Sequence, residues 1–264
     1  MPFPSDEQKQ VIDHRTSPLV VVAGPGTGKT KTLVERMISL LREDPSRNIS
    51  FITFTRTSRR DTQRKLEKEF GSDTLGGNEI VVPRVGTLHA NAKSIVHRYA
   101  PLLGRKSGFT ILLDSRGERD MLIQEVVDDL EIDIAVQELR EAISTYRCTY
   151  SWPDGIELSP DQRQQALDLF NQLLDFYNTF DFEGVVDAAC RLIDDEGVNL
   201  PPLFLQVDEF QDLNPADQRF VHLISSRQGS EVVVVGDDAQ SIYGFCHANY
   251  LDCVTFGRMK VGQT

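Results

Sequence analysis

The sequence lacks most features of extracellular, disulfide-bonded or membrane-spanning proteins. It has four cysteines with no C-x-x-C pair, and its five histidines are scattered, so neither a disulfide framework nor a structural metal site is indicated. No apolar run approaches the roughly 20 residues of a membrane span, and the N-terminus has no signal-peptide core. These absences predict a cytoplasmic protein with reduced thiols and no membrane partner.

An excess of positive charge is also lacking, since the formal net charge is −12. The charges are unevenly placed. Residues 47–107 hold twelve Lys and Arg against five Asp and Glu, a balance of +7, whereas residues 114–196 hold six against twenty-one, a balance of −15. The phosphates of a nucleic acid are attracted by the local electrostatic potential of a protein surface. A chain with a negative net charge can therefore still have a basic surface that binds them. Charge alone leaves two interpretations open: a nucleic-acid-binding face, or two solvated helix faces.

Short apolar or β-branched runs alternate with helical patterns, which predicts an α/β fold with a doubly wound parallel sheet. Helix starts are marked by Ser5 in a capping box and by Ser159 and Asn214, each followed by proline. From about residue 108 to residue 181 the pattern is helical, and no strand is predicted there. The predicted strands are Leu19 to Val22, Ile49 to Phe54, Ile80 to Thr87, Leu203 to Val207 and Val232 to Val235.

The first predicted strand runs into Ala23-Gly24-Pro25-Gly26-Thr27-Gly28-Lys29-Thr30, a glycine-rich turn that is typical of a phosphate-binding loop. Glycines let several backbone N–H groups face one anion. Lys29 can reach the β- and γ-phosphates, and the Thr30 hydroxyl can ligate Mg²⁺. Ala23 replaces the usual first glycine of this pattern. A hairpin turn is the alternative, which the flanking strand and helix disfavour.

Two adjacent carboxylates, Asp208 and Glu209, follow the fourth predicted strand. In a phosphate-binding sheet, Asp208 can hold Mg²⁺ and Glu209 can act as the general base toward water. Taken alone, such a pair is more often part of a solvated loop. The phosphate-binding loop therefore gives this pair its weight.

A third group of residues follows the fifth predicted strand. Gln240 can sense the γ-phosphate through its amide, and Tyr243 and Phe245 can stack on unpaired bases, at about 1–3 kcal/mol per base. The alternative for the two aromatic residues is packing in the core.

Together these segments resemble the UvrD/Rep group of superfamily 1 DNA helicases over nearly the whole chain. The resemblance implies a P-loop NTPase (RecA-like) parallel sheet with helices on both faces and an inserted, mainly helical subdomain. The implied division is residues 1–107 and 182–264 for the motor domain and 108–181 for the insertion. The matching motifs are Ser5 to Gln8, Ala23 to Thr30, Thr53 to Thr55, Thr87 to His89, Asp181-Phe182, Asp208 to Asp212 and Gly236 to Phe245.

The resemblance also implies roles for individual residues. Gln8 would read the adenine; as the partner in a capping box, its amide is expected to do only one of the two jobs at a time. ATP contacts are expected from Gln8, Ala23, Gly24, Pro25, Gly26, Thr27, Gly28, Lys29, Thr30 and Lys31, Mg²⁺ ligands from Thr30 and Asp208, and catalysis from Lys29, Asp208, Glu209 and Gln240. DNA contacts are expected from Phe54, Thr55, Arg56, Thr87, His89, Tyr243 and Phe245.

The sequence departs from the family pattern at three places, which puts some DNA contacts in doubt. These are Arg56-Thr57 after the first contact motif, Leu88 and Ala90 around His89, and Cys246-His247 after the third motif. Only nineteen residues follow Phe245, so the second motor domain of the family is expected to be missing from these residues. The resemblance implies that its arginines come from that domain or from a partner protein. We therefore expect ATP·Mg²⁺ and DNA binding, with little hydrolysis and no unwinding by these residues alone.

Two other functions stay open on the sequence. One is a non-motor module that binds nucleotide together with nucleic acid or a protein for regulation. The other is a small-molecule phosphotransferase built on the same loop, which the motifs around Asp208 and Gln240 disfavour.

Overall fold

The computed structural model describes residues 4–53, 56–70, 83–112, 117–195, 198 and 200–237. They divide into two compact units. Unit 1 is formed by residues 1–91, 199–213 and 221–264, and unit 2 by residues 92–198 and 214–220. Unit 2 reaches beyond residues 108–181 at both ends and also includes the start of a later helix, and the division into a motor domain and an insertion stays a prediction.

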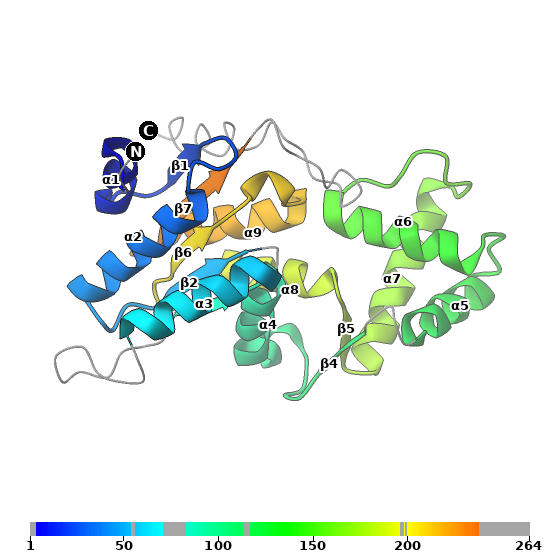
Figure 1. The fold of residues 1–264 in the computed structure, drawn as a ribbon. Coiled ribbons are helices and arrows are strands. Elements are labelled where there is room, and N and C mark those ends of the chain that lie inside the picture. Colours follow the sequence, from blue (N-terminus) through cyan, green and yellow to red (C-terminus); the bar gives the residue numbers. More distant parts are fainter. Residues whose placement is uncertain are drawn as a thin grey trace, which may run out of the picture. The chain divides into compact units, whose positions relative to one another are not determined.

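Unit 1 is built on a parallel five-stranded sheet of order β1-β7-β6-β2-β3, flanked by helices (Figure 1). The predicted strands are confirmed: β1 has the predicted bounds, and the described bounds of each of the other four differ at one or both ends by one to four residues. Their bounds are β1 Leu19–Val22, β2 Ile49–Ile52, β3 Arg84–Gly86, β6 Phe204–Val207 and β7 Glu231–Gly236.

The helices of unit 1 begin where the sequence has capping signals or a strand ends. Helix α1, Asp6–Asp13, has the predicted capping box, with Ser5 as N-cap. Helix α2, Lys29–Glu43, follows the phosphate-binding loop, and its buried face packs with Phe51, Val233 and α3, Arg56–Phe70, around one core. Two further elements are the short 3₁₀ helix η3, Phe210–Asp212, and the later part of α9, Pro215–Ser226. The α1–α2 pair and the sheet together position the loop between them.

Register places the carboxyl ends of the five strands at one edge of the sheet. Val22 pairs with Gly236, and Ile52 pairs with both Val207 and Gly86. The segments that follow these ends continue the pairing, as Ala23 N donates to Gly236 O at 3.0 Å. In open parallel sheets, ligands bind outside this edge.

Unit 2 is mainly helical. Its core lies among α5, α6 and α7, with Ile123, Leu139 and Phe170 buried in it. The predicted helix start at Ser159 is confirmed as a capping box with Gln162. The bounds are α4 Leu88–Tyr99 (from Ala92 in this unit), η1 Ala100–Leu103, α5 Glu118–Leu130, α6 Val136–Thr149, α7 Pro160–Phe176 and α8 Gly184–Asp194.

The prediction of no strand between residues 108 and 181 was wrong. Strands β4, Thr110–Leu112, and β5, Thr179–Asp181, form a parallel pair. Each has three residues, which is too short for a period to show in the sequence, and they pair across a long sequence separation. The described helices include none with the length and apolar character of a membrane span.

Candidate nucleotide-binding site

The phosphate-binding loop follows β1 and ends at the first turn of α2. Gly26 and Gly28 have φ values of +72° and +82°, which glycine adopts readily. A Cβ at Gly28 would lie 3.2 Å from Gln8 Nε2, so a side chain there would be both strained and crowded. Thr27 Oγ1 donates to Gly24 O at 2.8 Å, which closes the turn. The loop thus leads directly into a helix N-terminus, where anions are favoured.

Four of the predicted site residues meet at the carboxyl edge of the sheet. Thr30 Oγ1 donates to Asp208 Oδ2 at 2.6 Å, and Lys29 Nζ lies 3.6 Å from Glu209 Oε2. The side chain of Lys29 is only 8% exposed. Residues 178 positions apart in the sequence are therefore brought into direct contact by the sheet register.

Electrostatics at this edge suit a cation. Asp208 is buried, and this burial raises its pKa to about 6, against the hydrogen bond from Thr30. Burial and the nearby Glu209 also raise the pKa of Asp212 to about 6. A carboxylate whose negative charge is only partly balanced, next to a hydroxyl, offers oxygen ligands of the kind that Mg²⁺ prefers. Water and phosphate oxygens fill the remaining coordination positions of the ion. The donor set of Thr30 and Asp208 therefore fits Mg²⁺.

Gln8 forms the predicted capping box and also contacts the phosphate-binding loop, so both ends of its amide have protein partners, and its role toward adenine stays a prediction. Its Oε1 accepts from Ser5 N at 2.8 Å in the capping box, while its Nε2 donates to Thr27 O at 2.8 Å. The two ends of one amide thus join α1 to the phosphate-binding loop. A cavity of about 400 Å³ lies between them, lined by Ser5, Gln8, Val11, Ala23, Thr27 and Lys29 among others.

Arg36 on α2 is a site-supporting residue that the sequence did not reveal. Its side chain is 1% exposed, and it donates to Val11 O at 3.0 Å and to His14 O, and pairs with Glu231 at 3.2 Å. Burial lowers its pKa to about 10. Arg36 thereby anchors the C-terminal end of the helix that carries Gln8. An arginine within an amphipathic helix gives no sign of such burial.

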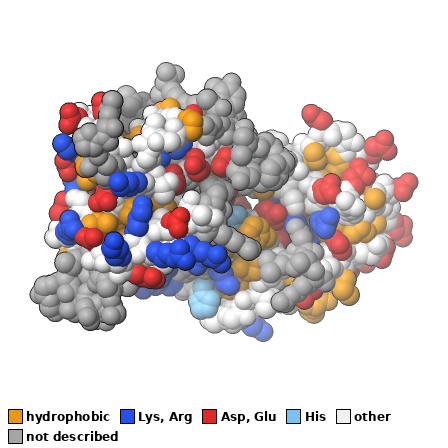
Figure 2. Space-filling model, viewed as in Figure 1, with side chains coloured by type: hydrophobic (Ala, Val, Ile, Leu, Met, Phe, Trp, Pro, Cys, Tyr) orange, Lys and Arg blue, Asp and Glu red, His pale blue; other side chains and the backbone are white. Residues whose placement is uncertain are grey.

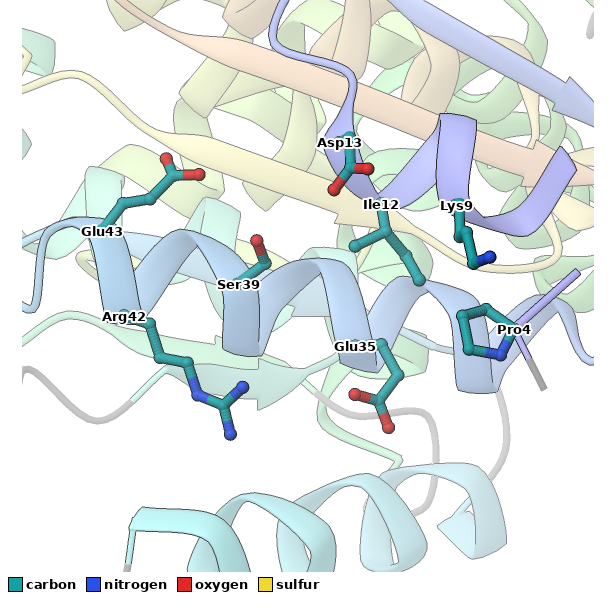
Figure 3. Close-up of a pocket in the computed structure, with 8 residues that line it drawn as sticks. All are labelled: Pro4, Lys9, Ile12, Asp13, Glu35, Ser39, Arg42 and Glu43. Carbon is teal, nitrogen blue, oxygen red and sulfur yellow. The ribbon is translucent and has the colours of Figure 1, made fainter. Parts of the chain in front are cut away.

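A second cavity, of about 470 Å³, lies beside α1 and α2 and has a charged lining (Figure 3). Lys9 and Asp13 come from α1, and Glu35, Arg42 and Glu43 from α2. It contains none of the predicted site residues and has no glycine-rich turn. The first cavity is lined by four of the predicted nucleotide contacts, Gln8, Ala23, Thr27 and Lys29.

Two of the residues predicted to contact DNA, Thr87 and His89, lie within the described part of the chain. Thr87 caps α4, because its Oγ1 accepts from Ala90 N at 3.2 Å. His89 is half-buried, and burial lowers its pKa to about 4, so the imidazole is neutral at physiological pH. Their roles toward DNA stay predictions. Phe54, Thr55, Gln240, Tyr243 and Phe245 lie outside the described residues, as does the side chain of Arg56.

Several of the lysines and arginines that make residues 47–107 basic lie on α3. Figure 2 shows blue side chains gathered over this helix. Its exposed cationic residues include Arg59, Arg60, Arg64, Lys65 and Lys68.

The fold and this edge define a phosphate-binding-loop α/β domain. The family described as UvrD/REP helicase N-terminal domain matches residues 5–258, and the chain belongs to this family. It is 28% identical to the ATP-dependent DNA helicase Rep of Escherichia coli strain K12, over 90% of this chain and 36% of Rep.

Two further relatives match the chain at a similar identity and over a similar share of their length. The chain is 27% identical to Rep of Buchnera aphidicola subsp. Baizongia pistaciae, over 93% of this chain and 37% of that protein. It is also 27% identical to the ATP-dependent DNA helicase PcrA of Staphylococcus aureus strain Mu50, over 95% of this chain and 35% of PcrA. The chain thus spans about a third of the length of these relatives.

Proposed function

We propose that this chain is the ATP-binding and single-stranded-DNA-contacting part of an ATP-dependent DNA helicase or translocase of the UvrD/Rep type. The observation that carries the proposal is the meeting of Lys29, Thr30, Asp208 and Glu209 at the carboxyl edge of the sheet. Family membership and the names of the relatives support it. The alternatives of a regulatory module and a small-molecule phosphotransferase become outcomes of the tests.

In this proposal, the phosphate-binding loop and Lys29 bind the triphosphate, and Gln8 lies beside the cavity for the base. Thr30 and Asp208 hold Mg²⁺, which when bound neutralises charge on the phosphate oxygens. Lys29 exchanges its ion pair with Glu209 for the phosphates. Glu209 is then available to orient a water molecule and accept its proton. Gln240 is proposed to sense the γ-phosphate, as the resemblance implies.

DNA binding is assigned to the predicted contact residues together with the cationic surface of α3. Because burial lowers the pKa of His89 to about 4, its imidazole is neutral at physiological pH. We propose that it contributes stacking or hydrogen bonding, and that arginines supply the attraction for phosphates. Arginines from a second motor domain or a partner protein are proposed to complete the catalytic site. Such arginines are worth 10³ to 10⁵ in rate in related enzymes, so slow hydrolysis is expected from the 264 residues alone.

The DNA part of the proposal is tested by the salt dependence of binding to a labelled oligothymidine. We expect log affinity to fall linearly with log salt, by about 0.7 per phosphate neutralised. The double variant Arg59→Ala, Arg60→Ala should weaken binding and reduce the slope by about 1 to 2. The control Arg191→Ala removes an exposed arginine of α8 that pairs with Asp187, and it should change neither quantity.

Two outcomes would contradict the assignment. Nucleotide binding without any oligonucleotide binding at low salt would favour a nucleotide-dependent regulatory module. Phosphoryl transfer to a metabolite, lost in Lys29→Ala, would favour a phosphotransferase.

A further inference from the structure

Gln211 joins two of the segments that end at the carboxyl edge of the sheet. Its Nε2 donates to Glu209 Oε2 at 2.9 Å, and its Oε1 accepts from Asp237 N at 3.0 Å. Gln211 lies in η3, which begins directly after Asp208 and Glu209, and Asp237 directly follows β7. One amide of fixed length therefore links the proposed general base to the end of a neighbouring strand.

Burial shields both hydrogen bonds of the Gln211 amide from water. The side chain of Gln211 is 3% exposed, so both ends of its amide are satisfied by protein rather than exchanged with bulk water. The contacts to the Glu209 carboxylate from Gln211 and from Lys29 both fall on Oε2. If Lys29 turns to the phosphates, Gln211 still holds Oε2, and Oε1 is left to face a water molecule. The backbone of Glu209, with φ +54° and ψ +48°, is also held in the left-handed region.

We propose that Gln211 is a positioning residue, which orients the Glu209 carboxylate for hydrolysis and makes that orientation depend on the placement of the chain at Asp237. The inference rests on the proposed function, because it requires Glu209 to act as a base. A base held within a fraction of an ångström of its productive position is worth a large factor in rate.

The variant Gln211→Met tests the proposal, since it keeps the length of the side chain and removes both hydrogen bonds. The control is Gln164→Met on α7, where the amide also donates to a carboxylate, Asp168 Oδ1 at 2.8 Å, on an exposed surface. The measurements are the affinity for a fluorescent ATP analogue and the single-turnover hydrolysis of ATP with Mg²⁺ and protein in excess. We expect Gln211→Met to bind the analogue within about twofold of wild type and to hydrolyse ATP roughly 10- to 100-fold more slowly.

A second variant, Gln211→Asn, keeps the amide but is one methylene shorter, so it cannot reach both Glu209 and Asp237 N. It should hydrolyse ATP as slowly as Gln211→Met, and it covers the case in which the methionine variant fails to fold. A rate close to wild type in a folded Gln211→Asn, or in Gln211→Met, would overturn the positioning role. A residue with only a structural role would lower the melting temperature in Gln211→Met without separating affinity from rate.

The controls separate this inference from the proposed function. Unchanged nucleotide affinity in Lys29→Ala would mean that the nucleotide site itself is wrongly assigned. A wild-type rate no faster than that of Glu209→Gln would overturn both the base and its positioning by Gln211, while nucleotide binding would stand.

Discussion

Each unit has a buried carboxylate at the end of a short parallel strand. The two carboxylates differ in the groups that balance their negative charge. Asp181 ends β5 in unit 2, where Oδ2 lies 2.6 Å from Arg147 Nε and 3.5 Å from Arg119 Nη2. Asp208 follows β6 in unit 1, where its Oδ2 accepts from the Thr30 hydroxyl at 2.6 Å and its Oδ1 accepts from Glu209 N at 3.2 Å. Both carboxylates are at most 1% exposed.

The comparison teaches that position after a strand does not by itself identify a functional carboxylate. Asp181 is compensated by two arginines of its own unit, as expected of a residue that stabilises the fold. Asp208 is compensated only in part, so burial raises its pKa to about 6. A buried carboxylate of the second kind can gain a cation from outside the protein, which is what a magnesium ligand must do.

The largest effect is expected at the compensated carboxylate. Asp181→Ala would remove the carboxylate that pairs with Arg147 and with the buried Arg119. Arg119 would keep its ion pair with Glu183, 3.2 Å away. The substitution should lower the free energy of unfolding by about 3 to 5 kcal/mol. Urea titration measures this quantity. The control Asp187→Ala removes a partly exposed carboxylate that pairs with Arg191 at 3.3 Å, and it should cost less than about 1 kcal/mol. Equal losses in the two variants would refute the distinction.

Lys29→Ala should act on binding rather than folding. The loss of the ammonium is expected to weaken a fluorescent ATP analogue by at least about 100-fold, which corresponds to about 2.7 kcal/mol. The control Lys9→Ala changes an exposed lysine on α1, which lines the second cavity in Figure 3. Wild-type affinity in Lys29→Ala would remove the main support for the nucleotide site.

Asp208→Asn should stabilise the nucleotide-free chain while abolishing the Mg²⁺ dependence of ATP binding. The pKa of Asp208 is raised from 3.8 to about 6, so the folded chain binds this proton more tightly than the unfolded chain. The stability gained from protonation is present below about pH 4 and is lost as the pH rises through about 6. At pH 7.5 the substitution should therefore add up to about 3 kcal/mol to the free energy of unfolding.

The pH dependence supplies the control for Asp208→Asn. Melting temperatures compared between pH 5 and pH 8 should show that the gain in stability grows with pH. Part of the pH dependence of stability should remain in the variant, because burial also raises the pKa values of Asp212 and Asp217, to about 6 and about 7. A loss of stability at pH 7.5 would contradict the view of Asp208 as incompletely compensated.

The smallest effect is expected at Gln8, for which unit 2 offers a matched residue. Gln8 and Gln162 occupy the same place in two capping boxes, but only Gln8 also donates to the phosphate-binding loop. Both alanine variants should lower stability by about 0.5 to 1 kcal/mol. Only Gln8→Ala should also weaken ATP-analogue binding several-fold, and equal affinities in the two variants would reduce Gln8 to a helix cap.

The elements of unit 1 could be predicted because their signals are local. Strands such as β1 and β7 are short apolar runs followed closely by glycine, and Ser5 marks a helix start by its own chemistry. Strands β4 and β5 could not be predicted, because each is three residues long and is stabilised by a partner far away in the sequence.

The candidate site was predictable as a set of motifs but not as a set of contacts. Lys29, Thr30, Asp208 and Glu209 stand in recognisable patterns, whereas their pairing depends on the register of β1, β7 and β6. The burial of Gln211 and Arg36 depends on packing from several elements, so no single stretch of sequence reveals it.

A crystal structure of the chain with Mg²⁺ and a non-hydrolysable ATP analogue would test the central claim most directly. We predict that Lys29 Nζ leaves Glu209, now 3.6 Å away, and contacts the phosphates, with Mg²⁺ beside Thr30 Oγ1 and Asp208. A bound nucleotide with Lys29 still paired to Glu209, or with Mg²⁺ held away from Asp208, would contradict the account.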